Sequence, residues 1–378
     1  MTEMNAKPEA GRKGTRMLLP VALAASLGLA TWLAPDGRCD TPARMPRPGP
    51  QVARSPDPAR ANAQCEGCHE DIAHEWRSSM HAQADTDPIY RRALAIEPLP
   101  FCRGCHAPEA DARTDAPPSL SALGVGCVTC HLTGTDPNGE TLATHGHGGS
   151  APHAVRREAA FATPAACASC HEFDFPTHAE GQPPERMQST SSEHAASDFR
   201  GASCASCHMP GVESRSGGSH RSHAFGASRD LTMLRAAVNV TAQRAGASRV
   251  TFALAPGRVG HAFPTGDLFR RVLVSVEVVD DDWIVWSEAS RALQRSFEMR
   301  RVAPGFVARH MVEDSRVGIA EAKPIVLNLG EAARGRAVAW RVEYQRVEHP
   351  LGVDGSGTVI ADSVVIAEGL LPATEVEP

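Results

Sequence analysis

The pentapeptide Cys65-Glu66-Gly67-Cys68-His69 decides how this chain folds, because its pattern C-x-x-C-H occurs five times. The other copies span residues 102–106, 127–131, 167–171 and 204–208. Together the five copies contain all but one of the 11 cysteines and five of the 17 histidines. Chance placement of these residues would produce about 0.01 copies of the pattern, so the repeat has a chemical cause.

Each copy has the spacing of a covalent haem c attachment site. Two thiols three positions apart lie on one side of a helical turn, where both can add to the vinyl groups of a single porphyrin. The histidine after the second thiol can then bind the iron. The sequence therefore predicts five covalently attached haems c. The attaching thiols are Cys65, Cys68, Cys102, Cys105, Cys127, Cys130, Cys167, Cys170, Cys204 and Cys207. The proximal iron ligands are His69, His106, His131, His171 and His208.

Other uses of paired cysteines fit this repeat less well. A zinc ribbon needs two C-x-x-C pairs for each metal, and neither zinc nor an iron–sulfur cluster requires a histidine in the fifth place. A redox dithiol would occur once, and disulfides between such close cysteines could not join distant segments. The remaining cysteine, Cys39, lacks the small apolar residues that lipid attachment needs before it, and we take it as incidental.

Composition argues against a nucleic-acid-binding role and indicates a globular protein. The 378 residues include 38 Lys and Arg against 44 Asp and Glu, for a formal net charge of −6, so we expect no large basic face. Hydrophobic residues make up 42% but aromatic residues only 5%, and successive motifs begin just 25 to 40 residues apart. We therefore expect the porphyrins themselves to fill the core, with haem attachment coupled to folding.

The first 34 residues have the pattern of an export signal. Four Lys or Arg residues precede an uncharged run at 17–34, which suits either a cleaved signal peptide or an N-terminal membrane anchor. Residues 35–62 contain seven prolines without apolar periodicity and are expected to form a linker. Both alternatives place the rest of the chain in the periplasm or otherwise outside the cytoplasm, with membrane contact only through an uncleaved N-terminal segment.

The character of the sequence changes near residue 229. Residues 63–228 hold all five motifs and are expected to form short helices joined by coil. A helix at roughly 230–243 is followed by β-branched runs with period-two alternation, which predict a β-sandwich within 229–378. The predicted fold class is α+β, with a mainly helical and coil multihaem domain that has few strands, then a β-sandwich-like domain. No catalytic constellation stands out, and Asp314-Ser315-Arg316 is expected to be an ion-paired turn.

The twelve histidines outside the motifs are candidates for the sixth ligand of each iron. In the stretch 68–81, which we expect to be helical, His81 can reach a neighbouring iron, and His74 on the same helical face can do so instead. Methionine is the other common ligand, and Met80 and Met187 lie in the same region. The number of histidines favours bis-histidine coordination for most irons.

The strings around these motifs resemble the multihaem cytochrome c-554 family, whose haem packing is shared with hydroxylamine oxidoreductase. The resemblance covers roughly residues 63–345. Its strings are Trp-x-x-Ser-x-His ending at His81, Cys-His-Ala-Pro at 105–108, Gly-Val-Gly-Cys-Val-Thr-Cys-His at 124–131, His-Ala-Val-Arg-Arg at 153–157, Met-Gln-Ser-Thr at 187–190, Cys-His-Met-Pro at 207–210, Ser-His-Ala-Phe-Gly at 222–226 and Gly-His-Ala-Phe-Pro-Thr-Gly at 260–266. The resemblance implies that His81, His153, His223 and His261 are distal iron ligands. One departure is His194, in a stretch where relatives often place tryptophan.

The motifs predict an electron carrier between respiratory redox partners, with a membrane quinol-oxidising complex as one candidate partner. Without residues 1–34 and with five ferric haems the net charge would be about −13, which suits a partner with a basic docking face.

The alternative is a haem enzyme with one open iron that acts on a small nitrogen or sulfur compound. No motif ends in the lysine typical of pentahaem nitrite reductases. Neither Tyr90 nor Tyr344 lies near the motif that carries the crosslinked tyrosine of hydroxylamine oxidoreductases. Open iron coordination is the property that separates the carrier from the enzyme.

Overall fold

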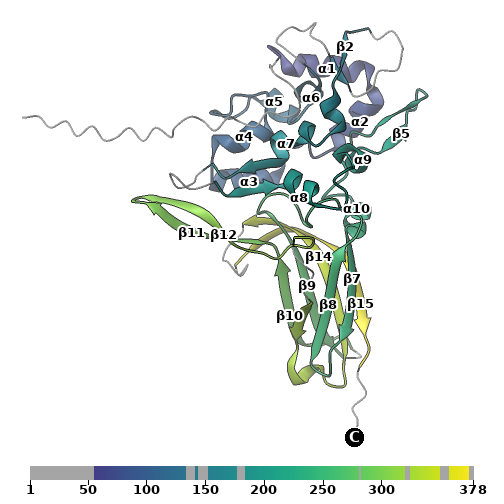
Figure 1. Ribbon diagram of the computed structural model, residues 1–378, viewed down its shortest axis with the longest axis vertical. Helices are drawn as coiled ribbons and strands as arrows, with labels where there is room; N and C mark the ends of the chain where they lie inside the picture. Colours follow the sequence, from purple (N-terminus) through teal and green to yellow (C-terminus); the bar gives the residue numbers. More distant parts are fainter. Residues whose placement is uncertain are drawn as a thin grey trace, which may run out of the picture. The chain divides into compact units, whose positions relative to one another are not determined.

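Figure 1 shows the computed structural model of the chain, in which helices precede a set of long strands. It describes residues 55–132, 141–143, 152–176, 184–280, 282–319, 324–349 and 357–373. All of them belong to one compact unit, Ala43–Pro378. This arrangement confirms the α+β class. The predicted export segment, Cys39 and the linker as far as residue 54 lie outside the described residues.

The helical region, residues 55–236, is built from short helices that end at the motif histidines. Four of these helices end on a motif histidine, and the fifth, α1, ends one residue before His69. These helices are α1 (Pro58–Cys68), α4 (Pro100–His106), α6 (Cys127–His131), α7 (Ala165–His171) and α9 (Cys204–His208). Asp57 caps α1 by accepting a hydrogen bond from the backbone N–H of Arg60, and Ser203 caps α9 in the same way. Helices this short are not stable alone in water, so they depend on packing.

Further helices and short two-stranded sheets lie between the motifs. The helices are α2 (Glu70–Ser78), α3 (Pro88–Ile96), α5 (Pro118–Leu123), α8 (Thr190–Ala196) and the 3₁₀ helix η1 (Ala159–Ala162). The strand pairs are β1 (Thr141–Ala143) with β2 (Val155–Arg157), β3 (Glu172–Asp174) with β4 (Arg186–Ser189), and β5 (Gly211–Glu213) with β6 (Ser219–Arg221). One small hydrophobic cluster is buried here, formed by Ala61, Trp76, Ala82, Leu123 and Val128.

The strand region, residues 238–373, contains two larger sheets. One has the order β10-β9-β14-β15 and the other β13-β8-β7, while the β11–β12 hairpin stands apart as a sheet of its own (Figure 1). The strands are β7 (Val238–Arg244), β8 (Arg249–Pro256), β9 (Arg270–Val279), β10 (Val285–Leu293), β11 (Arg295–Ala303), β12 (Phe306–Asp314), β13 (Ile325–Asn328), β14 (Ala337–His349) and β15 (Val359–Leu371). A 3₁₀ helix, η2 (Gly330–Ala333), follows β13.

Period-two alternation places one face of each larger sheet in a shared core. Phe252 of β8 is fully buried and meets Trp340 of β14, in the other sheet, edge-on at a centroid distance of 5.9 Å. Both sheets therefore contribute to one hydrophobic cluster. Four alternate residues of β9 have no exposed surface: Val272, Val274, Val276 and Val278.

The predicted helix at 230–243 is wrong beyond residue 236. Asp230 caps α10 (Leu231–Ala236), and β7 then begins at Val238 and pairs antiparallel with β8. In β7 the β-branched residues Val238 and Val240 alternate with polar residues, which is the period-two pattern of a strand. The antiparallel pairing with β8 covers all of β7, so this segment is a strand and not a continuation of the helix.

A buried polar cluster joins the helical and strand regions. Glu193 of α8 pairs with Arg316 at 2.7 Å, and their side chains are only 6% and 4% exposed. Arg316 also pairs with Asp314 at 2.7 Å, which confirms the predicted ion-paired turn. Hydroxyl groups complete the cluster, since Thr265 donates to Glu193 at 2.6 Å and Ser189 donates to it at 2.8 Å. We call these five residues the Glu193 cluster.

No helix within the described ranges is long and apolar enough to cross a membrane.

Candidate haem-binding site

The motif cysteines meet across different motifs. None of the ten forms a disulfide, and three cysteine pairs bring the side chains of different motifs together. These pairs are Cys65 with Cys127, Cys105 with Cys170, and Cys167 with Cys204. Cys130 also lies near Cys170. The first motif is therefore next to the third, and the fourth is next to the second, third and fifth.

Four motif histidines face a second histidine ring from elsewhere in the chain. The ring centroids are 6.4 Å apart for His69 and His153, 6.1 Å for His131 and His223, 6.3 Å for His171 and His81, and 6.2 Å for His208 and His261. Two imidazoles bound to opposite sides of one metal, each through a bond of about 2 Å, have ring centres about 6 Å apart. Each pair has the separation that two axial ligands of one iron require.

The turn after α2 holds His81 in place. The backbone N–H of Val125 donates to the carbonyl of His81 at 2.8 Å, and the indole N–H of Trp76 donates to the carbonyl of Val125 at 2.8 Å. Phe225 then packs edge-on against His81 at 4.2 Å and against His223 at 5.6 Å. Its φ of +49° is unusual for a bulky residue, so the surrounding packing holds the ring against two of the paired histidines despite a cost in backbone conformation.

Burial lowers the pKa of several of the paired imidazoles and so favours the neutral form, which is the form that binds a metal. Burial, followed by neighbouring imidazoles, lowers the pKa of His81 to about 3 and that of His171 to about 4. Burial and then the charge of His131 lower the pKa of His223 to about 4. The pKa of His261 is also lowered, mainly by burial.

The second ring nitrogen of several motif histidines is hydrogen-bonded. Three of them donate Nδ1–H to a backbone carbonyl at 2.7 Å: His106 to Ala84, His131 to Leu142 and His208 to Gly226. Such bonds leave Nε2 to bind a metal and make the imidazole a more basic ligand. His171 differs, because its Nδ1 lies 3.1 Å from the amide nitrogen of Gln188. Nothing in the C-x-x-C-H pattern points to Gln188, although it lies in the Met-Gln-Ser-Thr string at 187–190.

The second motif is arranged differently. The ring of Tyr90 stacks on His106 with centroids 3.7 Å apart and planes within 3°. Among the residues that the structure describes, no histidine ring pairs with His106. The Tyr90 hydroxyl is buried without a hydrogen-bond partner in that part of the chain, and burial raises the pKa of Tyr90 far above its usual value. Nothing in the sequence marks Tyr90 as a neighbour of a haem motif, and the structure places it directly against the second one.

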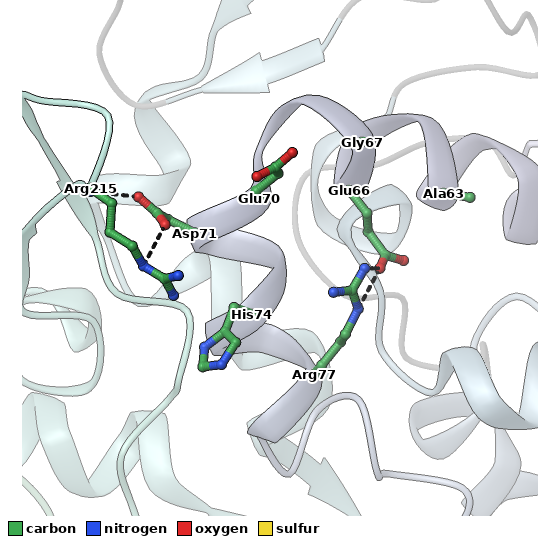
Figure 2. A pocket seen from close by; sticks show the side chains of 8 residues that line it. All are labelled: Ala63, Glu66, Gly67, Glu70, Asp71, His74, Arg77 and Arg215. Carbon is green, nitrogen blue, oxygen red and sulfur yellow. Dashed lines mark hydrogen bonds and ion pairs between the residues drawn. The ribbon is translucent and has the colours of Figure 1, made fainter.

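His74, the alternative to His81, lies outside these pairs. It is exposed on α2 and lines a hollow of about 510 Å³ (Figure 2). Ion pairs between Glu66 and Arg77 and between Asp71 and Arg215 flank this hollow. Of these two candidates, only His81 faces a motif histidine among the described residues.

Other candidate ligands fall outside the pairs or outside the described residues. His194 is buried on α8, where a Cβ added to Gly260 would lie 3.3 Å from its ring. It contacts the loop next to His261 without facing a motif histidine. His145, His147 and His178 belong to segments that are not described. Within the described ranges, no group of three or more His, Cys, Asp or Glu side chains could hold a bare metal ion.

Replacing Gly124 by alanine is expected to displace His81 and destabilise the protein. Gly124 has a φ of +52°, and a Cβ there would lie 2.5 Å from the His81 carbonyl oxygen and 2.6 Å from that of Ala82. Both neighbours are backbone atoms and cannot move aside cheaply. Loss of one low-spin signal in the electron paramagnetic resonance spectrum, with a lower melting temperature, would show the displacement.

Gly246→Ala is the matched control for this substitution. Gly246 also has a positive φ, +86°, but an added Cβ would meet nothing within 4 Å. Gly246→Ala should lower the free energy of unfolding only by the backbone strain, roughly 1 kcal/mol, and should leave the spectrum unchanged. Equal effects of the two substitutions would refute the role given to Gly124.

Comparisons with known proteins agree with this geometry. Residues 64–132, which contain the first three motifs and His81, match the family model for cytochrome c554 and c-prime. In fold, the chain is similar to a penta-haem cytochrome c552 from Thermochromatium tepidum. The two are 20% identical, with a TM-score of 0.61 over 85% of this chain and 99% of that chain. The chain is a multihaem c-type cytochrome. No curated protein sequence matches this cytochrome.

The side chains of the cytochrome fit haem c. The motif thiols can hold a porphyrin on two sides, and the imidazole pairs have the spacing of axial ligands. When bound, haem c supplies an iron that alternates between the ferrous and ferric states. The resemblance drawn from the motif strings is therefore confirmed at the level of a multihaem c-type cytochrome.

Proposed function

We propose that this cytochrome binds five haems c and carries electrons between redox partners. The four histidine pairs carry this proposal, because each joins a motif histidine to a histidine that the resemblance nominates. In the proposal the motif histidines bind the five irons from one side. The distal ligands are His153 for the first motif, His223 for the third, His81 for the fourth and His261 for the fifth. An iron held by two histidines has no position free for a substrate, which suits electron transfer.

The contacts between motifs support a branched path for the electrons. The thiol contacts place the first motif beside the third and the fifth beside the fourth, while Cys130 and Cys170 bring the third and fourth together. These three contacts connect the first, third, fourth and fifth motifs in that order. The second motif connects only to the fourth, through Cys105 and Cys170. Electrons would then pass through the haem of the fourth motif on every route to the second or fifth.

The partners and the location form part of the same proposal. An exported protein with an uncharged run at 17–34 and an acidic holoprotein suits a periplasmic exchange with a partner that has a basic docking face. A membrane quinol-oxidising complex is a candidate for such a partner. We infer that the two larger sheets form a β-sandwich domain that serves as a scaffold or a partner-binding surface.

A second candidate function is a haem enzyme with one open iron at the second motif. The observation that favours it is the environment of His106, which pairs with no histidine ring among the described residues and instead stacks on Tyr90. Asp267 and Arg270 are close enough to act on the pKa of His106, which burial lowers. A small nitrogen or sulfur compound is the class of substrate that such an iron would take.

The coordination of the irons tests the two functions. Electron paramagnetic resonance of the ferric holoprotein should show low-spin signals for the bis-histidine haems, and carbon monoxide added to the reduced form should find only an iron with an open position. A wholly low-spin spectrum without carbon monoxide binding would leave electron transfer alone. A high-spin signal that changes in a His106 variant, with carbon monoxide binding at that iron, would support the enzyme.

Replacing His81 by alanine is expected to convert one haem from low spin to high spin while all five porphyrins stay attached. The substitution removes one axial ligand and leaves the thiols of every motif in place. Electron paramagnetic resonance and the mass of the holoprotein measure the two effects. His74→Ala is the control, since His74 is exposed and faces no motif histidine, and it should leave the spectrum unchanged. A normal spectrum for His81→Ala would refute the assignment.

A further inference from the structure

The imidazole of His106 is held by two contacts of different kinds. Its Nδ1–H donates to the carbonyl of Ala84 at 2.7 Å. The ring of Tyr90 lies flat against its face, with centroids 3.7 Å apart and planes within 3° of parallel. The hydrogen bond acts in the plane of the imidazole and the stack acts across that plane, so the two contacts restrain different motions.

The hydrogen bond alone does not fix the plane of the imidazole. A ring bonded through one nitrogen can still tilt about the line that joins this nitrogen to its acceptor, because hydrogen bonds tolerate imperfect alignment. A flat ring in van der Waals contact with one face of the imidazole blocks this tilt. Among the described residues, His131 has a similar neighbour in Phe161, but the centroids are 5.2 Å apart and the planes differ by 30°. The contact at His106 is therefore the tighter one.

Tyr90 is itself fixed by the start of α3. The carboxylate of Asp87 caps this helix, since its Oδ1 accepts from the backbone N–H of Ile89 at 3.0 Å and from that of Tyr90 at 3.1 Å. The other oxygen pairs with Arg229 at 2.7 Å, and the Asp87 side chain is only 8% exposed. The backbone at Tyr90 is thus anchored to two other parts of the helical region, and its ring can serve as a rigid support.

We propose that Tyr90 is a positioning residue that fixes the plane of the His106 imidazole on the second iron. The inference rests on the proposed role of His106 as an iron ligand. Residues that orient a metal-binding histidine without touching the metal tune the properties of the centre. The direction of the imidazole plane relative to the porphyrin nitrogens affects the g values of a ferric haem. A single fixed plane should therefore give one narrow signal.

Removing the flat ring tests this role. Tyr90→Leu keeps an apolar side chain but leaves the imidazole restrained by the Ala84 bond alone, so it can take a range of planes. In the electron paramagnetic resonance spectrum of the ferric holoprotein, the signal of the second iron should broaden and its g values should shift. The other signals should stay as they are. The signal that changes in a His106 variant identifies the second iron.

Two controls separate this effect from a general loss of packing. Tyr90→Phe keeps the ring and removes only the hydroxyl, which has no hydrogen-bond partner in the described part of the chain, so the spectrum should be unchanged. Phe297→Leu removes a half-buried ring of the strand region that packs edge-on against Phe175 at 5.3 Å, and it should also leave every signal unchanged. Where Tyr90→Leu lowers haem content or melting temperature, Tyr90→Met decides, because methionine fills more of the space without a flat face.

An unchanged second signal in the variants that lack the ring, an equal change in Tyr90→Phe, or a joint change of several signals would overturn the inference. The mass of the same holoprotein counts its porphyrins and checks the assignment beneath it. Five attached haems with an unchanged signal refute the role of Tyr90 alone. A missing haem at 102–106 in the unsubstituted protein, or the lack of any signal that responds to a His106 variant, refutes the proposed function at this motif.

Discussion

Replacing Arg316 by alanine is expected to lower the free energy of unfolding by about 3–5 kcal/mol. The guanidinium pairs with Glu193 and Asp314 at 2.7 Å each and donates to the carbonyl of Pro264 at 3.2 Å. With Arg316 gone, the Glu193 carboxylate stays buried without its cation, and this uncompensated charge is the main cost. Chemical denaturation of the holoprotein, followed by circular dichroism, measures the change.

A double variant provides the control. In Arg316→Met with Glu193→Gln, the buried carboxylate is also removed, so the loss should be clearly smaller than for Arg316→Ala. The exposed pair of Arg334 and Glu331 is the second comparison, because Arg334→Ala should cost no more than about 1 kcal/mol. A loss below 1 kcal/mol for Arg316→Ala would show that the Glu193 cluster does not hold the two regions together.

The same cluster predicts how stability changes with pH. The pKa of Glu193 is lowered in the folded protein, so its contribution is fully present above its unfolded pKa of about 4.3. That contribution is lost as the pH falls through the folded pKa. Arg316→Ala removes the cation that lowers the pKa of Glu193. The stability of this variant should then no longer fall at acid pH because of Glu193.

Replacing Phe252 by alanine is expected to cost about 3–5 kcal/mol of unfolding free energy. Phe252 has no exposed surface and lies in the cluster that both larger sheets share. The substitution removes a whole ring and leaves a cavity against Trp340, which the two sheets cannot close without moving. The midpoint of chemical denaturation should fall accordingly.

Val326→Ala on the adjacent strand β13 is the matched control. Val326 is 53% exposed, so its truncation should change stability by no more than about 0.5 kcal/mol. Similar effects for the two substitutions would mean that the shared cluster contributes little to stability.

The attachment motifs were predictable because their chemistry is local. The thiols and the proximal histidine of one haem lie within five consecutive residues, and a short helix is enough to place them. The distal histidines are different. The motif strings nominate His81, His153, His223 and His261, and these assignments stay predictions, but only the folded chain shows which motif histidine each one faces.

What the sequence could not show depends on contacts between distant segments. Gln188 lies in a quoted string, yet only the folded chain shows that its side chain lies 3.1 Å from Nδ1 of His171. Tyr90 lies in the first turn of α3, a helix that no motif marks, and it stacks on His106 through tertiary packing alone. The error at 237–243 has the same origin, because β7 exists through its pairing with β8.

The pairing of histidines also has consequences for how such a protein is made. The N-terminus is synthesised first, so all five attachment motifs emerge before His261, the partner of His208, which lies beyond β8. His153 and His223 likewise follow the motifs they would complete. A nascent chain that stops at residue 228 would carry every thiol needed for attachment and still lack a ligand for its last iron. On the proposed assignments, coordination would not be completed one haem at a time along the chain, and the last iron would gain its second ligand only after residue 261 has been synthesised.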